Sequence, residues 1–389
     1  MRMADRLAAI QPFRVMEVLD RAAAHEVAGR RVVHLEVGEP DFSTCEPVTS
    51  AGLDALSRGD TKYTSALGIA PLREAIAGYY EQRGVAVDPA RVVVTAGASG
   101  GLLLLSSALL NPGEKVLVTD PGYPCNEVFA AAVGADALAV KVHAENRFQP
   151  TWQDLNEAWD ATVQGALLAS PANPTGTVVP LEALEEIARG VRGKDGFLIM
   201  DEIYQGVVFT PTDYDTVLEV DPEAIVLQSF SKYFGMTGWR LGWVVVPDSM
   251  ISGITRLAQN LFISPPTVAQ HAAVAAFSPA AMAEHEARRV KFAQRHQRLL
   301  VGLRALGVDV PVSGDGAFYI YADISSSGLD SMTFCLRLLD EYQVACAPGC
   351  DFGAHDAERY VRFSYTVDLE DIELGLERIG QALEKFRAE

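Results

Sequence analysis

Short apolar segments alternate with segments of helical periodicity through the first part of the chain. Runs that are apolar at nearly every position are typical of strands covered on both faces, and helices between successive strands favour parallel pairing. Such runs occupy residues 91–95, 115–119, 166–169, 197–200 and 224–227. The pattern therefore predicts an α/β fold with a mostly parallel, doubly wound sheet in a large domain.

The pattern changes in the last part of the chain. Helical periodicity over residues 288–306 is followed by an apolar segment at 317–322 and by further helix and strand signals. A chain of 389 residues exceeds the usual size of one domain. We therefore expect an N-terminal arm that forms part of a small domain (1–45), a large domain (46–285) and a small α+β C-terminal domain (286–389).

Polar side chains cluster where the predicted strands end. The apolar runs are followed by AGASGG at 96–101, DPGYP at 120–124, SPANPTG at 170–176, DE at 201–202 and QSFSK at 228–232. Ligands of open parallel sheets bind outside the carboxyl ends of the strands. The sequence therefore predicts one crevice, and these side chains are the candidates for its chemistry.

Composition and charge argue against several classes of protein. Hydrophobic residues make up 49% of the chain, which is typical of a globular protein. No segment has the roughly 18 uncharged apolar residues of a membrane helix, and the net charge of −19 argues against nucleic acid as a partner. The five cysteines lack CxxC spacing, so we expect reduced thiols and no metal site. The charged start does not resemble a secretory signal, and a cytoplasmic protein is expected.

The sequence SFSK, which ends at Lys232, is followed by GWRLG, which contains Arg240. A lone lysine after a buried strand is most often a solvated surface residue. Here, Ser229 and Ser231 supply hydroxyl donors and Arg240 supplies a guanidinium, and together they suit a phosphate group. A lysine beside a phosphate site is suited to Schiff-base chemistry with a carbonyl cofactor, which makes Lys232 the central candidate.

These motifs, in their order along the chain, resemble those of the class I/II aminotransferases, the fold-type-I enzymes of the aspartate aminotransferase superfamily. The resemblance extends from Gly38 to Arg362 and so covers nearly the whole chain. It implies pyridoxal 5'-phosphate as the cofactor, with Lys232 as the lysine that forms the Schiff base and acts as the proton-transfer base. It also implies that the two serines of SFSK and Arg240 hold the phosphate.

The residues that end two more strands fit the same resemblance. A buried carboxylate needs a cation or a strong donor, and the resemblance places Asp201 against the pyridine nitrogen of the cofactor. It places Tyr204 and Asn173, the latter within SPANPTG, at the phenolic oxygen of the cofactor. The Asn173–Pro174 bond is expected to be cis. A helix N-cap aspartate and a plain turn are the simpler interpretations of these residues.

Further cofactor contacts are assigned from the resemblance. Ala98 and Ser99 lie where a strand meets a helix, and the N–H groups at a helix N-terminus bind anions. The resemblance implies that both contact the phosphate. Tyr123, in PGYP, matches the aromatic residue that stacks on the pyridine ring. Tyr63 matches a tyrosine that reaches the phosphate of the neighbouring subunit, which implies a homodimer with shared active sites.

Two elements indicate an amino-acid substrate. Arg362, in VRFS, matches the arginine that grips the substrate carboxylate, and a planar guanidinium gives such a group both charge and orientation. Gly38, in GEPDF, matches a loop whose backbone meets the same carboxylate, and Asn173 contributes there as well. An exposed position on a strand is the alternative interpretation of Arg362. The segment 348–353 resembles a loop near the site, but no chemical role is assigned to it.

The combined expectation is an aminotransferase that moves an amino group from an L-amino acid to a 2-oxo acid by a ping-pong mechanism. A C–S or β-lyase of the same fold is the main alternative. Many such lyases carry a histidine and a following basic residue in the loop where this chain has Ala172 and Thr177. A non-catalytic binding protein would have lost Lys232, Asp201 or Arg240, and a nicotinamide dehydrogenase needs a dinucleotide fingerprint that this chain lacks.

The identity of the amino acid stays open at this point. An enzyme for aspartate or glutamate needs a cation for the second carboxylate, and spacing alone does not identify one. Arg14, beside Phe13, could face either the substrate side chain or the solvent. Alanine, aromatic, branched-chain and dicarboxylic amino acids all remain candidates.

Overall fold

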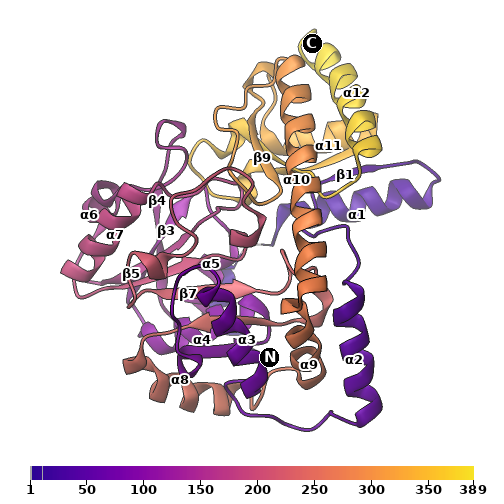
Figure 1. The fold of residues 1–389 in the computed structure, drawn as a ribbon. Helices are drawn as coiled ribbons and strands as arrows, with labels where there is room; N and C mark the ends of the chain where they lie inside the picture. Colours follow the sequence, from indigo (N-terminus) through magenta and orange to yellow (C-terminus); the bar gives the residue numbers. More distant parts are fainter. Residues whose placement is uncertain (1, 11) are drawn as a thin grey trace.

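A computed structural model describes residues 2–10 and 12–389 of the chain. It contains a seven-stranded sheet and a four-stranded sheet, each packed against helices (Figure 1). The strands of the large sheet follow the order β2-β8-β7-β6-β5-β3-β4. Their bounds are β2 Val92–Thr95, β3 Lys115–Asp120, β4 Asp136–Lys141, β5 Val163–Ala169, β6 Phe197–Asp201, β7 Ile225–Ser229 and β8 Gly242–Val245.

Most neighbouring strands of the large sheet are parallel. β3 to β7 pair in parallel, and β8 is antiparallel to both β7 and β2. β2 therefore runs in the same direction as the parallel strands. The predicted α/β fold with a mostly parallel sheet is confirmed. Because these strands have their carboxyl ends at one edge of the sheet, the residues that follow them are brought together.

Alternate residues of the strands enter two separate hydrophobic clusters, one on each face of the sheet. Leu198 and Met200 of β6 belong to one cluster, whereas Ile199 between them belongs to the other. Successive side chains of a strand point to opposite faces, so a strand that is apolar at every position needs cover on both. The covering helices are α4 (Gly97–Leu109) and α8 (Asp248–Leu261) on the Ile199 side, and α3 (Ala70–Glu81) and α7 (Leu181–Gly193) on the other.

The four-stranded sheet combines segments from both ends of the chain. β1 pairs in parallel with β10, so residues near the N-terminus complete a sheet built mainly from the C-terminal part. The helices α1, α11 and α12 pack against it (Figure 1). In the order β1-β10-β11-β9, the strands are Val33–Leu35, Val344–Pro348, Tyr360–Ser364 and Tyr319–Asp323. The helices are α1 Arg14–Val27, α11 Ser331–Tyr342 and α12 Leu369–Phe386.

A long helix, α10 (Pro279–Ala305), packs against α2 (Glu46–Arg58) beside the large sheet and against β9 of the small sheet and α12 (Figure 1). The Ser278 hydroxyl caps its first turn by accepting from the Ala281 N–H. The predicted domain boundary at residue 286 falls inside this helix and stays a prediction.

No helix within the described ranges has the length and apolar content of a membrane span. The remaining helices are α5 Cys125–Ala132, α6 Trp152–Ala158 and α9 Thr267–Val274.

The predicted elements differ from the observed ones mainly at their ends. The segment 97–100, expected between a strand and a helix, forms the first turn of α4. Gly97 has a φ of +73°, which a residue without a Cβ adopts freely, and so the helix begins directly after β2. Within the apolar segment 317–322, the strand β9 starts only at Tyr319, because Ala317 has a left-handed φ of +58° that does not continue a strand.

Candidate active site

A pocket of about 370 Å³ lies at the carboxyl ends of the strands of the large sheet. Residues that end or follow β2, β3, β5, β6 and β7 line it, together with residues of the small sheet and of α1. The pocket thus joins segments from opposite ends of the chain. Its lining includes most of the predicted site residues, namely Gly38, Ala98, Ser99, Tyr123, Asn173, Asp201, Tyr204, Ser229, Ser231, Lys232, Arg240 and Arg362.

The amine of Lys232 is buried in the wall of this pocket. Its Nζ donates to the Gly38 carbonyl oxygen at 2.6 Å and lies 5.6 Å from the centroid of the Tyr204 ring. Burial, and then the nearby Arg362 guanidinium, lowers the pKa of Lys232 to about 8. Because an ordinary lysine has a pKa of about 10.4, far more of this amine is neutral near pH 8. A neutral amine is the form that attacks a carbonyl or takes up a proton.

Asp201 is the last residue of β6, and only 5% of it is exposed. The Ile203 N–H donates to its Oδ1 at 3.1 Å. Burial raises the pKa of Asp201 to about 7, against the smaller opposing effects of this N–H and of the Lys232 charge. A carboxylate in such surroundings is stabilised by any cation or strong donor that enters the pocket.

Arg362 enters the pocket from β11. Its Nη1 donates to Asn173 Oδ1 at 3.0 Å, and its Nη2 donates to the Glu36 carbonyl oxygen at 2.6 Å. The guanidinium also lies over the rings of Tyr319 and Phe352, with Cζ 4.3 Å and 4.7 Å from their centroids. Its Nε is buried without a hydrogen-bond partner among the described residues. A fixed guanidinium with an unpaired donor suits a carboxylate ligand.

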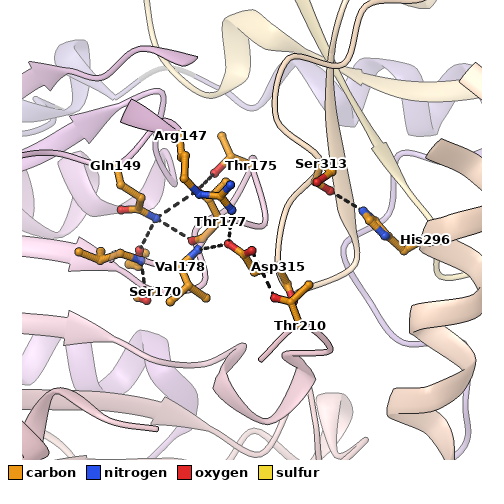
Figure 2. Close-up of polar contacts among 12 residues, drawn as sticks. Arg147, Gln149, Ser170, Thr175, Thr177, Val178, Thr210, His296, Ser313 and Asp315 are labelled. Carbon is orange, nitrogen blue, oxygen red and sulfur yellow. Dashed lines mark hydrogen bonds and ion pairs between the residues drawn. The ribbon is translucent and has the colours of Figure 1, made fainter. Parts of the chain in front are cut away.

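Polar contacts hold the loop that carries Asn173 (Figure 2). The Asn173–Pro174 peptide bond is cis, as predicted. Gln149 Nε2 donates to the Thr177 carbonyl oxygen at 2.7 Å, and Asp315 Oδ2 accepts from the Val178 N–H at 2.9 Å. The loop is therefore tied both to the segment after β4 and to the segment before β9. These contacts fix the amide of Asn173 where Arg362 meets it.

The predicted phosphate residues lie in the first turn of α4, at the end of β7 and just before β8. The Ser231 N–H donates to Ser229 Oγ at 3.0 Å, and Arg240 lies with its guanidinium beside the first turn of α4. A Cβ at Gly242 would lie 2.9 Å from the Ala98 backbone nitrogen, so glycine lets β8 approach this turn closely. Hydroxyls, a guanidinium and a helix N-terminus together make a suitable anion site.

Tyr319 is a site residue that the sequence did not reveal. Its hydroxyl lies 2.8 Å from the Tyr204 hydroxyl, and burial raises the pKa of both phenols. Tyr319 lies within the apolar segment 317–322, where neither the residue types nor their spacing singled it out. Tyr123, which the sequence did indicate, lines the same pocket, and burial raises its pKa as well.

The loop after β10 also contributes, although no role was assigned to it from the sequence. The Asp351 carboxylate accepts from the N–H groups of Arg14 and Val15, each at 2.7 Å, and so caps the N-terminus of α1. Phe13 and Val15 then line the pocket, whereas the exposed Arg14 is not among its lining residues. Of the two positions considered for Arg14, the structure favours the one in solvent.

Tyr63 is the one predicted cofactor-contacting residue that lies outside the pocket of its own chain. It is 80% exposed, in the segment between α2 and α3. Its expected role concerns a neighbouring subunit, and that role stays a prediction.

Known proteins resemble this chain over nearly its whole length. The family described as Aminotransferase class I and II matches residues 30–379. A valine–pyruvate aminotransferase of Mycobacterium tuberculosis is 42% identical, over 98% of this chain and 99% of that protein. An aspartate/prephenate aminotransferase of Thermus thermophilus is 33% identical, over 97% and 98%. The crystal structure of an aminotransferase from Mycobacterium tuberculosis superimposes with a TM-score of 0.95 at 41% identity, covering 99% of this chain and all of that one. The chain belongs to the class I and II aminotransferase family.

Proposed function

We propose that this protein is a pyridoxal 5'-phosphate-dependent aminotransferase that transfers an amino group from an L-amino acid to a 2-oxo acid by a ping-pong mechanism. One observation carries the proposal. Lys232, with its lowered pKa, shares a pocket with the buried carboxylate of Asp201 and with the unpaired Nε of Arg362. Lys232 would react with an aldehyde, Asp201 would pair with a pyridine nitrogen, and Arg362 would bind a substrate carboxylate.

The residues of the pocket fit this cofactor. Asp201, buried with one backbone donor, would hold a protonated ring nitrogen, which would offset the cost of its burial. Tyr123 would stack on the ring, and Tyr204 and Asn173 would donate to the phenolic oxygen. The anion site of Ala98, Ser99, Ser229, Ser231 and Arg240 would hold the phosphate, and the close approach permitted by Gly242 supports that assignment.

In this proposal, Arg362 binds the substrate and Lys232 transfers its proton. Arg362 binds the carboxylate and, with Asn173, orients the amino acid so that its Cα–H bond faces the lysine. When bound, the cofactor supplies a carbonyl that condenses with amines and a ring that accepts electrons from Cα. The neutral Lys232 amine takes the proton from Cα and later returns a proton, acting first as base and then as acid.

We also propose a homodimer in which Tyr63 of each chain reaches the phosphate site of the other. The high exposure of Tyr63 supports this, because a large aromatic side chain in solvent gains from burial at an interface. The named activities of the relatives, on valine and pyruvate and on aspartate and prephenate, support amino acids and oxo acids as substrates.

The test is to add pyridoxal phosphate to the purified protein and to record its absorbance in the near-ultraviolet and visible range. We expect a Schiff-base band that borohydride fixes on Lys232, as located by peptide mass spectrometry. An amino acid should then convert the band to the amine form, and an oxo acid should restore it. Lys194→Arg, at an exposed lysine after α7, is the matched control for Lys232→Arg and should keep the band. A colourless protein, or a label on another lysine, would refute the proposal.

A further inference from the structure

The first turns of α1 form an apolar wall of the pocket. Phe13, Val15, Met16 and Leu19 line it, and Phe13 and Met16 remain 37% and 51% exposed. Val15 and Leu19 lie four residues apart and therefore share one face of the helix. Large apolar side chains that line a pocket while still exposed gain free energy when an apolar ligand covers them.

This wall lies close to Arg362, the residue proposed to bind the substrate carboxylate. Asp351 caps the N-terminus of α1 through both of its carboxylate oxygens. The next residue, Phe352, has its ring 4.7 Å from Arg362 Cζ. The carboxylate and the side chain of an amino acid are both attached to Cα. A substrate whose carboxylate meets Arg362 therefore has its side chain within reach of the α1 wall.

Among the described residues, the side chains on this side of the pocket offer no free cation. Glu36 contributes to the lining, but its side chain is fully buried and pairs through Oε1 with His34 Nδ1 at 2.7 Å, a contact that raises the pKa of His34 to about 9. Asp351 lines the pocket as well. The Lys and Arg side chains among the lining residues are Lys232, Arg240 and Arg362, to which the proposed function already gives roles. A second carboxylate on the substrate would thus meet an apolar wall and no free cation of this chain's lining.

We propose that this site takes amino acids and 2-oxo acids with an uncharged, apolar side chain and rejects dicarboxylic ones, with the apolar wall of α1 setting this preference. The proposal rests on the proposed aminotransferase function and names its substrate class. Because both substrates of a ping-pong reaction occupy the same pocket in turn, the preference applies to the amino donor and to the oxo-acid acceptor alike.

The first experiment compares two ligands of similar length that undergo no reaction. Calorimetric titration of the protein, supplied with pyridoxal phosphate, measures the Kd of 4-methylpentanoate and of glutarate. We expect the apolar ligand to bind at least about tenfold more tightly. In turnover, kcat/KM for leucine and valine should exceed that for glutamate and aspartate by a similar factor. Tighter binding of glutarate would overturn the proposal. Turnover of no amino acid would refute the aminotransferase function instead, and the Kd ratio would still decide the preference.

One pair of variants tests the role of the wall. Leu19→Lys, which places a cation on the α1 wall, should shift the Kd ratio about tenfold toward glutarate, whereas Ala24→Lys on the exposed side of α1 should not. An unchanged ratio in Leu19→Lys, or an equal shift in Ala24→Lys, would overturn the proposal.

Discussion

The buried carboxylate of Asp201 is expected to destabilise the protein whenever the cofactor is absent. Asp201 is 5% exposed, and the Ile203 N–H donates to it at 3.1 Å. Burial raises its pKa from 3.8 to about 7. The substitution Asp201→Asn keeps the shape of the side chain and an oxygen for the Ile203 N–H but carries no charge. We therefore expect it to stabilise the cofactor-free protein while abolishing activity, a trade of stability against function.

The size and the pH dependence of this gain follow from the pKa. The rise from 3.8 to about 7, which already includes the opposing effect of the Lys232 charge, corresponds to roughly 4 kcal/mol as an upper limit. Because folding raises the pKa of the carboxyl, its contribution to stability is fully present below about pH 3.8 and is lost as the pH rises to about 7. The advantage of Asp201→Asn in free energy of unfolding should thus reach at most about 4 kcal/mol at pH 8 and stay below about 2 kcal/mol at pH 5.

Urea unfolding of cofactor-free protein, followed by tryptophan fluorescence between pH 5 and 8, measures this difference. Asp20→Asn, at an exposed aspartate of α1, is the control for the loss of one negative charge and should change little. Added pyridoxal phosphate should stabilise the wild type more than Asp201→Asn, since only the wild type offers the carboxylate to the ring nitrogen. A variant less stable than the wild type at pH 8, or a gain independent of pH, would refute the reasoning.

Three further predictions concern the same pocket. The rate at which cofactor-free protein takes up pyridoxal phosphate should rise with pH through a midpoint near 8, because only the neutral Lys232 amine reacts, and a stopped-flow midpoint near 10 would contradict this. Arg362→Lys should lower kcat/KM by about 100-fold or more with cofactor affinity unchanged, because an ammonium lacks the planar pair of donors with which a guanidinium binds a carboxylate. Gly242→Ala should weaken pyridoxal phosphate binding at least about tenfold in a fluorescence titration, because its Cβ would lie 2.7 Å from the Gln228 carbonyl oxygen on β7 and 2.9 Å from the Ala98 nitrogen and would push β8 away from α4. An unchanged Kd would remove Gly242 from the phosphate site.

Much of the large sheet and of the cofactor site could be predicted because the signals are local. The core strands are apolar at most positions, since both of their faces are covered, and polar residues at their ends, such as Asp201 and Ser229, line the pocket. Lys232, Arg240 and the serines of SFSK lie within one short segment, and Asn173 lies in another. In such segments, the residue types and their spacing are visible before the chain folds. The boundaries were less certain, as Gly97 and Ala317 show, because single positive φ angles decided them.

The sequence alone therefore determined the α/β fold and the identity of the residues that end the strands. Only the tertiary structure decided which distant segments complete the pocket. Tyr319 meets Tyr204, and Asp351 caps α1, through contacts between residues far apart in the chain. The apolar wall on α1 depends on that cap and on the parallel pairing of β1 with β10. Such contacts leave no local pattern, because each partner is an ordinary residue until folding places it against the other.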